Sequence, residues 1–338
     1  MERITVTLGK TGLKVNKNGF GALPIQRISE AEAIRLLHKA FDGGINFYDT
    51  ARFYTDSEVK LGKAFGGDMR QKVIIASKSM ARNVTDFHKD LETTLRNLQT
   101  DYLDLYQFHN PPFCPLPDGE DGLYNAMTEA VNKGQVRHFG ITNHSIAVAR
   151  QAIDSGLFAT LQFPFNYLSG DKELELVHKC KAADMGFIAM KSLSGGLITN
   201  SEAAYAFLAG YDNVLPIWGI QKEKELDEFL EYIDNPPVMT EKIKKFINTE
   251  RQELAGEFCR GCGYCLPCPA GIEIYTCARM SLLLRRSPSE FQLTPEVQAK
   301  MRKIEDCTQC HSCSARCPYN LDTPKLLRKN YDDYLTWL

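Results

Sequence analysis

Short apolar runs alternate with segments of helical periodicity between about residues 17 and 235, and this alternation limits the fold more than any other feature of the 338-residue chain. The apolar runs are expected to be strands, and they cover residues 19–23, 45–48, 73–76, 103–108, 136–141, 160–163, 186–190 and 214–217. The segments between them include expected helices at 30–41, 85–98, 123–133 and 172–183. Eight strand-then-helix units predict an α/β fold, a (β/α)8 TIM barrel. A doubly wound sheet is the alternative, but no Gly-x-Gly-x-x-Gly follows the first expected strand.

The remaining sequence predicts three further parts. Residues 3–7 and 13–15 flank two glycines and are expected to form a β-hairpin ahead of the barrel. The barrel domain is expected to fill residues 1–236, and a helical linker is expected at 237–255. Residues 256–338 would then form a small, mainly α-helical domain that ends in a helix beginning near residue 323.

Composition excludes several classes of protein. The chain is 43% hydrophobic and 24% charged, as in ordinary globular proteins. A net charge of −2 argues against a dedicated nucleic-acid binder. No apolar run approaches the roughly 20 residues of a membrane span, and the N-terminus lacks the apolar core of a signal peptide. We therefore expect a cytoplasmic protein with neither a membrane nor a nucleic-acid partner, in which dense cysteines bind metal.

Eight of the eleven cysteines form two runs that each end in Cys-Pro. The runs are Cys259-Arg-Gly-Cys262-Gly-Tyr-Cys265-Leu-Pro-Cys268-Pro and Cys307-Thr-Gln-Cys310-His-Ser-Cys313-Ser-Ala-Arg-Cys317-Pro. Three cysteines at intervals of three and a fourth before proline are typical of ligands to a [4Fe–4S] cluster. Two zinc ions are the alternative, because eight thiolates would satisfy two tetrahedral sites. The triple register and the Cys-Pro endings favour iron–sulfur.

The most specific stretch of the expected barrel is residues 44–62, Gly-Ile-Asn-Phe-Tyr-Asp-Thr-Ala-Arg-Phe-Tyr-Thr-Asp-Ser-Glu-Val-Lys-Leu-Gly. It resembles the signature of the aldo-keto reductases, Gly-x-Asn-x-x-Asp-Thr-Ala-x-x-Tyr-x-x-Ser-Glu-x-x-Leu-Gly. The resemblance implies a catalytic tetrad of Asp49, Tyr54, Lys78 and His109, the last two at the ends of the third and fourth expected strands.

These four residue types also make chemical sense together. A tyrosine hydroxyl is a weak acid, and a neighbouring ammonium favours its phenolate form. Tyr54 would then donate a proton to a carbonyl oxygen, while Lys78, held by Asp49, would promote that transfer. His109 would orient the carbonyl or relay the proton. Taken singly, Asp49 could instead belong to a turn and His109 could be a hydrogen-bonded residue at a strand end.

The family resemblance also implies residues that bind a nicotinamide cofactor. They are Thr142, Asn143, Gln162, Met190, Ser192, Leu193, Gly195, Gly219, Gln221 and Lys222. Met190 stands where the family has a ring-stacking aromatic, and Gly195 would let backbone amides approach the pyrophosphate.

The eighth loop departs from the family pattern. Glu225 and Phe229 stand where an arginine and an asparagine are expected, so a phosphate clamp is lost and Glu225 would repel a 2′-phosphate. Lys222 or Lys224 would compensate. NADPH and NADH therefore both remain open as the cofactor.

The whole chain resembles an aldo-keto reductase subgroup that carries a C-terminal ferredoxin-like [4Fe–4S] domain. In bacterial-type ferredoxins the fourth cysteine of each run binds the other cluster. The resemblance thus implies one cluster on Cys259, Cys262, Cys265 and Cys317, and a second on Cys307, Cys310, Cys313 and Cys268. Only two residues separate Cys265 from Cys268, where three are usual. Cys277 lies outside both runs and is expected to be a core residue.

The resemblance implies an NAD(P)H-dependent oxidoreductase that interconverts a small carbonyl substrate and an alcohol. Hydride transfer moves two electrons, whereas each cluster accepts one, so the clusters either serve an electron-transfer partner protein or stabilise a small domain. A redox or iron sensor that uses the barrel as a ligand platform is the alternative function. Phe53, Phe113 and Trp218 could wall an apolar substrate pocket, and a rigid surface loop is the competing interpretation for the segment around Phe113.

Overall fold

The computed structural model describes residues 4–254, 258–286 and 289–338, which divide into two compact units. The first unit runs up to Ser192 and resumes over Glu202–Glu241. The second unit contains Leu193–Ser201 together with Lys242–Leu338. The boundaries expected from the sequence, after residues 236 and 255, stay predictions, and the second of them falls outside the described residues.

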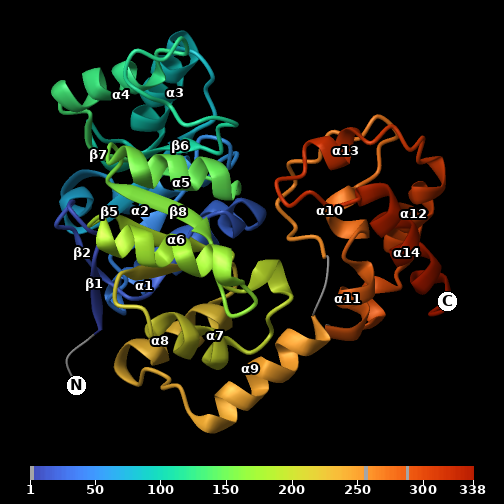
Figure 1. Cartoon of the computed structure of the whole chain (residues 1–338). Helices are drawn as coiled ribbons and strands as arrows, with labels where there is room; N and C mark the ends of the chain where they lie inside the picture. Colours follow the sequence, from blue (N-terminus) through green and yellow to red (C-terminus); the bar gives the residue numbers. More distant parts are fainter. Residues whose placement is uncertain (1–3, 255–257, 287–288) are drawn as a thin grey trace. The chain divides into compact units, whose positions relative to one another are not determined.

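The first unit contains a closed barrel of eight parallel strands, so the barrel prediction is confirmed and the doubly wound sheet is excluded (Figure 1). The strands are β3 (Gly19–Gly21), β4 (Phe47–Asp49), β5 (Ile74–Ser79), β6 (Leu103–His109), β7 (Val136–Thr142), β8 (Thr160–Pro164), β9 (Gly186–Met190) and β10 (Val214–Gly219). The strands neighbour one another in chain order, and β10 pairs with β3 to close the barrel.

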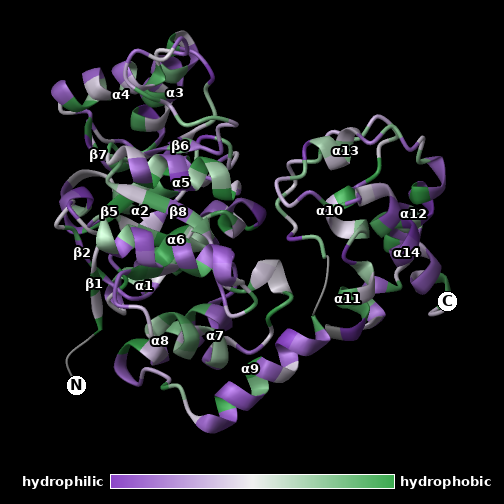
Figure 2. Cartoon of the chain, viewed as in Figure 1, coloured by the Kyte–Doolittle hydropathy of each residue, from purple (hydrophilic) through white to green (hydrophobic). Residues whose placement is uncertain are grey.

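A helix follows each strand of the barrel. The helices are α1 (Glu30–Asp42), α2 (Ser57–Phe65), α3 (Val84–Asn97), α4 (Leu123–Asn132), α5 (Ile146–Ser155), α6 (Asp171–Ala182), α7 (Ser201–Ala209) and α8 (Glu223–Asp234). Figure 2 shows hydrophilic and hydrophobic residues alternating along α6, as expected for a helix with one face on the barrel. Expected and observed ends differ by a few residues: β4 begins at Phe47 and not at Ile45, because the Ile45 N–H closes α1 by donating to Ala40 O.

The strands are buried on both faces, which explains their continuous apolar runs. All seven residues of β6 are buried, including Gln107 and His109. Alternate residues of a strand point the same way, so these two polar side chains share one face near the C-terminal end of β6.

A hairpin of β1 (Thr5–Thr7) and β2 (Lys14–Asn16) precedes the barrel, as predicted, although residue 3 of the expected hairpin lies outside the described residues. Its buried side chains Val6 and Val15 join one apolar cluster with Phe47, Leu105 and Leu215 of the barrel strands. These strand residues lie in the first half of their strands, so the hairpin leaves the C-terminal ends available for a site.

The second unit is mainly helical. Its helices are α9 (Glu241–Glu253), α10 (Ile274–Cys277), α11 (Met280–Arg286), α12 (Pro295–Arg302), α13 (Ser312–Ala315) and α14 (Thr323–Leu335). Cys277, Met280, Met301, Tyr331 and Tyr334 contribute to its core, which confirms Cys277 as a core residue. Among the described residues, none of the helices combines the length and apolar character needed to cross a membrane.

Candidate functional site

Three members of the expected tetrad lie at neighbouring strand ends of the barrel. Asp49 ends β4, Lys78 is the penultimate residue of β5 and His109 ends β6. The Lys78 ammonium donates to Asp49 Oδ2 at 2.7 Å and to Thr50 O at 2.7 Å. Both side chains of the ion pair are almost fully buried, which fixes the lysine at the C-terminal end of the barrel.

Tyr54 follows β4 in the loop that leads to α2 and is half-buried. Lys78 Nζ lies 5.4 Å from the centre of the Tyr54 ring. The Tyr54 and His109 rings meet edge to face, with 6.0 Å between their centroids. The structure therefore brings all four expected residues together, with the tyrosine nearest to solvent.

Burial sets the protonation states of this group. It raises the pKa of Asp49 and lowers the pKa of Lys78, and the attraction between the two charges opposes both shifts. Burial and the charge of Lys78 hold the pKa of His109 well below its usual value. His109 is thus neutral at pH 7, and its buried Nδ1 has no hydrogen-bond partner among the described residues. A neutral imidazole can hold a carbonyl oxygen but is a poor proton donor.

Gln107 is a buried polar residue of this site that the sequence interpretation missed. Its Nε2 donates to Gln162 Oε1 at 2.7 Å, and Gln162 Nε2 lies 3.4 Å from Asp49 Oδ2. Its own Oε1 is buried without a partner in the described part of the chain. The signal that could have found it is its spacing, two residues before His109 on a strand that is otherwise largely apolar.

The expected nicotinamide residues around β7, β8 and β9 lie at the same end of the barrel. Thr142 ends β7 and its Oγ1 lies 3.7 Å from Sδ of Met190, which ends β9. Asn143 Oδ1 accepts from the backbone N–H groups of His144 and Ser145, and its amide donates to Pro111 O at 2.8 Å. Asn143 therefore braces its own loop in addition to any ligand role.

The remaining expected cofactor residues are divided between the units. Ser192 is buried at the end of the first unit and donates to Ala189 O at 2.9 Å. Leu193 and Gly195 belong to the second unit. Gly219 ends β10, and Gln221 and Lys222 lie just before α8.

Glu225 has a structural role that the sequence did not predict. Its carboxylate accepts from the backbone N–H groups of Gln221 and Lys222, each at 3.0 Å, and so caps α8. Glu225 was expected to repel a 2′-phosphate. Its carboxylate also accepts the hydrogen bonds of two backbone N–H groups that a phosphate at this helix end would use.

Trp218 is not a substrate-pocket residue. Its indole is fully buried, stacks on Phe229 with 4.4 Å between ring centroids, and donates to Asn18 Oδ1 at 2.8 Å. The interpretation of Trp218 as a pocket wall is therefore wrong, because a large apolar surface is worth more in the core. Phe53, beside Tyr54, is 70% exposed and available to a substrate.

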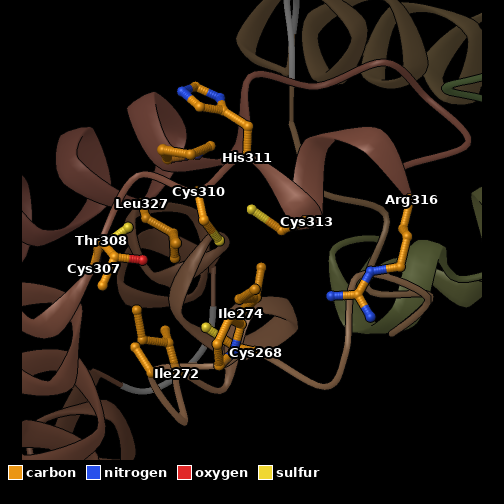
Figure 3. Close-up of a pocket in the computed structure, with 13 residues that line it drawn as sticks. Cys268, Ile272, Ile274, Cys307, Thr308, Cys310, His311, Cys313, Arg316 and Leu327 are labelled. Carbon is orange, nitrogen blue, oxygen red and sulfur yellow. The ribbon is translucent and has the colours of Figure 1, made fainter.

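The eight cysteines of the two runs line two separate cavities of the second unit. The Cys259 cavity is lined by Cys259, Cys262, Cys265 and Cys317. The Cys268 cavity is lined by Cys268, Cys307, Cys310 and Cys313. Figure 3 shows the sulfur atoms of the second set around one space, with Arg316 at its far side from Cys307. Each cavity takes three cysteines from one run and the fourth from the other.

The spacing of these thiols bears on the choice between zinc and a cluster. Among the described residues, no three His, Cys, Asp or Glu side chains converge closely enough to hold one metal ion. A zinc ion needs sulfurs about 2.3 Å away, whereas a cubane separates its four ligands and needs a cavity between them. The two cavities fit the larger group.

Two family models match this chain, one in its barrel region and one in its cysteine-rich region. Residues 17–206 match the aldo/keto reductase family, and residues 258–322 match the 4Fe-4S dicluster domain. The chain is similar to L-galactose dehydrogenase of Arabidopsis thaliana, with 30% identity over 210 residues that cover 57% of this chain and 66% of the relative. An uncharacterized oxidoreductase of Bacillus subtilis is 27% identical over 220 residues, covering 56% of this chain and 67% of the relative. The chain thus spans about two thirds of the length of these curated relatives.

Solved structures share the barrel. An aldo-keto reductase from Klebsiella pneumoniae in complex with NADPH aligns with a TM-score of 0.64 and 22% identity, covering 74% of this chain and 95% of that chain. The holo form of an aldo-keto reductase from Bacillus halodurans gives a TM-score of 0.65 at 20% identity, covering 74% of this chain and 96% of that chain. At this level of identity the likeness establishes the fold.

Proposed function

The chain belongs to the aldo/keto reductase family of NAD(P)H-dependent oxidoreductases, and we propose that it interconverts a small carbonyl compound and an alcohol with Tyr54 as general acid and base. The observation that carries this proposal is the buried Lys78–Asp49 pair, 2.7 Å long, beside Tyr54 and His109 at one end of the barrel. A barrel used only as a ligand platform would not need a buried ion pair next to a tyrosine.

In the direction of reduction, the Tyr54 hydroxyl gives its proton to the carbonyl oxygen. The Lys78 ammonium favours the phenolate that remains, and Asp49 holds that ammonium in place. Neutral His109 donates a hydrogen bond to the same oxygen and so orients the carbonyl. A bound reduced nicotinamide would supply the hydride to the carbonyl carbon, and Tyr54 regains its proton from solvent.

The cofactor would be held by residues at the ends of β7, β8 and β9, among which the family resemblance assigns Asn143 and Gln162 to the carboxamide. Gln107 Oε1 and His109 Nδ1 are buried and have no hydrogen-bond partner in the part of the chain that the structure describes, which supports a polar ligand at this end of the barrel. NADPH and NADH are both compatible with these groups. Glu225 disfavours a 2′-phosphate, whereas Lys222 favours one.

We also propose that each cysteine cavity holds one [4Fe–4S] cluster. The crossed arrangement, with Cys317 in the Cys259 cavity and Cys268 in the cavity of the other run, supports this ligand set. The short Cys265–Cys268 interval still lets Cys268 reach the other cavity.

The catalytic proposal is tested with anaerobically purified full-length protein. We expect oxidation of NADPH or NADH in the presence of simple aldehydes, and a loss of about 10²- to 10⁴-fold in kcat for Tyr54→Phe. Tyr124→Phe, on α4, is the matched control, because its ring packs on Phe139 and keeps that contact. Unchanged activity in Tyr54→Phe would refute the role of this residue.

The cluster proposal is tested by iron and acid-labile sulfide analysis of the same preparations. Two clusters of four irons predict about eight irons per chain. Cys262→Ser and Cys310→Ser should each remove about half of the iron, while Cys277→Ala, outside both cavities, should remove none. Two zinc ions per chain without sulfide would instead support the zinc alternative.

A further inference from the structure

Arg279 is a buried cation of the second unit, and within residues 4–254, 258–286 and 289–338 no carboxylate forms an ion pair with it. Arg279 comes directly after Ala278 in the chain, and Ala278 lines the Cys259 cavity. Arg279 itself is only 7% exposed. Its Nε–H is buried without a hydrogen-bond partner among the described residues. A buried guanidinium is strongly disfavoured unless an anion balances it.

Two glycines adjoin the guanidinium of Arg279. At Gly195, with φ +64°, an added Cβ would come within 3.1 Å of Arg279 Nη1. At Gly261, with φ +65°, an added Cβ would overlap Nη1 and approach Cζ to 3.3 Å. Both glycines have left-handed backbones that a side chain would strain. A larger residue at either position would also crowd the arginine, and we call the space that the two glycines leave for it the slot.

The slot joins the first cysteine run to the segment Leu193–Ser201, all within the second unit. Arg279 Nη2 donates to Gly195 O at 2.6 Å. Gly261 donates its N–H to Cys259 Sγ at 3.4 Å. The glycine that adjoins the guanidinium therefore also contacts a sulfur of the Cys259 cavity. The charge of Cys259 favours the cationic form of Arg279, against a burial that lowers its pKa.

We propose that Arg279 is the counter-cation of the cluster in the Cys259 cavity and that the same guanidinium fixes the segment Leu193–Ser201. This inference rests on the cluster assignment proposed above. A [4Fe–4S] cluster with four thiolates is an anion, and it gains a further negative charge on reduction. A fixed cation beside it therefore stabilises the reduced form and raises the reduction potential of that cluster. Each cavity also has an arginine on its lining. Arg260 of the Cys259 cavity donates to Phe258 O, and Arg316 of the Cys268 cavity is exposed and donates to the carbonyls of Leu266 and Pro267, so neither is a buried cation like Arg279.

The arrangement gives one residue two roles. The segment that Arg279 fixes contains Leu193 and Gly195, which the family resemblance assigns to cofactor binding. Its position then depends on a side chain that also senses the charge of the cluster. Arg279 is thus a positioning residue and makes no contact with reacting atoms.

The test is an anaerobic redox titration of the full-length protein, followed by electron paramagnetic resonance, with hydrogen exchange of the peptide covering residues 193–201 as a second readout. In Arg279→Gln we expect one of the two cluster potentials to shift to a more negative value while the other stays unchanged. Protection of the 193–201 peptide should fall in the same variant. Arg285→Gln is the matched control, because it removes the same charge from an exposed arginine of this unit that pairs with Asp333.

Arg279→Lys separates charge from hydrogen bonding. The ammonium keeps the charge but lacks the planar fork, so we expect a potential near that of the unsubstituted protein and reduced protection of the peptide. The inference is wrong if Arg279→Gln leaves both potentials unchanged, or if Arg279→Lys lowers the potential as far as Arg279→Gln does. If Arg279→Gln does not retain the cluster, the lysine variant decides alone: a potential near that of the unsubstituted protein supports the inference, and a clearly more negative potential overturns it. Absence of two cluster signals in the unsubstituted protein would instead refute the cluster assignment.

Discussion

At the scale of single residues, Gln107 is a positioning group whose removal should weaken cofactor binding more than catalysis. It holds the amide of Gln162, which in turn approaches Asp49. In Gln107→Leu one buried hydrogen bond is lost, worth about 1 kcal/mol, and Gln162 is left free to turn. We expect KM for the nicotinamide cofactor to rise about fivefold, with a smaller change in kcat, in steady-state assays.

Gln71→Leu is the control for this variant, because the same substitution is made at an exposed position. An equal fall in kcat with unchanged KM would place Gln107 in the chemical step instead. A loss of thermal stability with normal kinetic constants would reduce its role to packing.

The four tetrad residues were expected from the resemblance to the family signature, and the structure brings them together, while their catalytic roles stay a proposal. The sequence did not predict Gln107, because a single polar residue in a strand has several possible partners and only the closed barrel shows that Gln162 is the one it meets. It predicted Glu225 as a repulsive charge and missed its capping role. That role depends on where α8 begins, and helix ends are poorly defined by periodicity.

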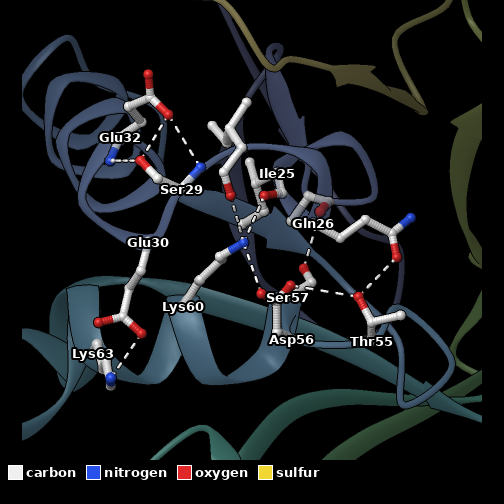
Figure 4. Close-up of polar contacts among 12 residues, drawn as sticks. Ile25, Gln26, Ser29, Glu30, Glu32, Thr55, Asp56, Ser57, Lys60 and Lys63 are labelled. Atoms are coloured by element: carbon white, nitrogen blue, oxygen red, sulfur yellow. Dashed lines mark hydrogen bonds and ion pairs between the residues drawn. The ribbon is translucent and has the colours of Figure 1, made fainter.

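At the scale of elements, Lys60 of α2 ties the loop that carries Tyr54 to the loop after β3 (Figure 4). Its ammonium donates to Ile25 O at 3.0 Å and Ile28 O at 2.8 Å and pairs with Asp56 at 2.8 Å. Lys60→Met leaves the part-buried Ile28 carbonyl without a donor, whereas Ile25 O keeps the Ile28 N–H at 3.3 Å. We therefore expect a loss of about 1–3 kcal/mol in the free energy of unfolding. Urea titrations in a Trp337→Phe background, which leaves Trp218 as the single tryptophan of the sequence, measure this loss by fluorescence, and kcat should fall as the Tyr54 loop loosens.

Lys63→Met is the matched control for Lys60→Met. Lys63 lies in the same helix and pairs with Glu30 at 2.7 Å, but both side chains of that pair are more than 40% exposed. Such a pair contributes about 0–1 kcal/mol, so this variant should unfold almost like the unsubstituted protein. Equal losses in the two variants would contradict the role given to Lys60.

The N-terminus of α8 is a second element with a testable role. Glu225→Gln keeps an oxygen that can cap the Gln221 and Lys222 amides but removes the negative charge. If the 2′-phosphate of NADPH binds there, the ratio of kcat/KM for NADPH to that for NADH should rise about tenfold, equal to about 1.4 kcal/mol. Glu223→Gln is the control, since Glu223 lies in the same turn but is exposed and paired with Lys39. An unchanged ratio would mean that the 2′ position lies elsewhere.

At the scale of the whole molecule, the sequence predicted the barrel because short apolar runs and segments of helical period alternate regularly, and each is a local signal. It did not predict that Leu193–Ser201 belongs to the second unit, because this grouping depends on contacts with residues such as Arg279, 84 positions away from Gly195. The crossed cysteine sets could be anticipated only through the resemblance to ferredoxins. Spacing alone does not reveal which cavity receives Cys268 or Cys317.

The pH dependence of stability follows from two histidines buried in the barrel. Burial lowers the pKa of His144 to about 3 and holds the pKa of His109 well below its usual value, whereas both titrate near 6.5 in the unfolded chain. Below about pH 6.5 the unfolded chain binds protons that the folded barrel does not bind, so stability is complete above that pH and falls as the pH decreases.

From pH 7 to about pH 5, His144 alone should cost about 2 kcal/mol in the free energy of unfolding. Urea titrations in the Trp337→Phe background would show this loss through Trp218 fluorescence, which then reports on the barrel. The slope of the unfolding free energy against pH counts the protons taken up on unfolding, and in His144→Gln this number should fall by about one. The expectation holds whatever the variant does to stability at pH 7. A slope that is the same in this variant would mean that His144 is already protonated in the folded barrel, and the buried end of β7 would then have to supply an anion beside it.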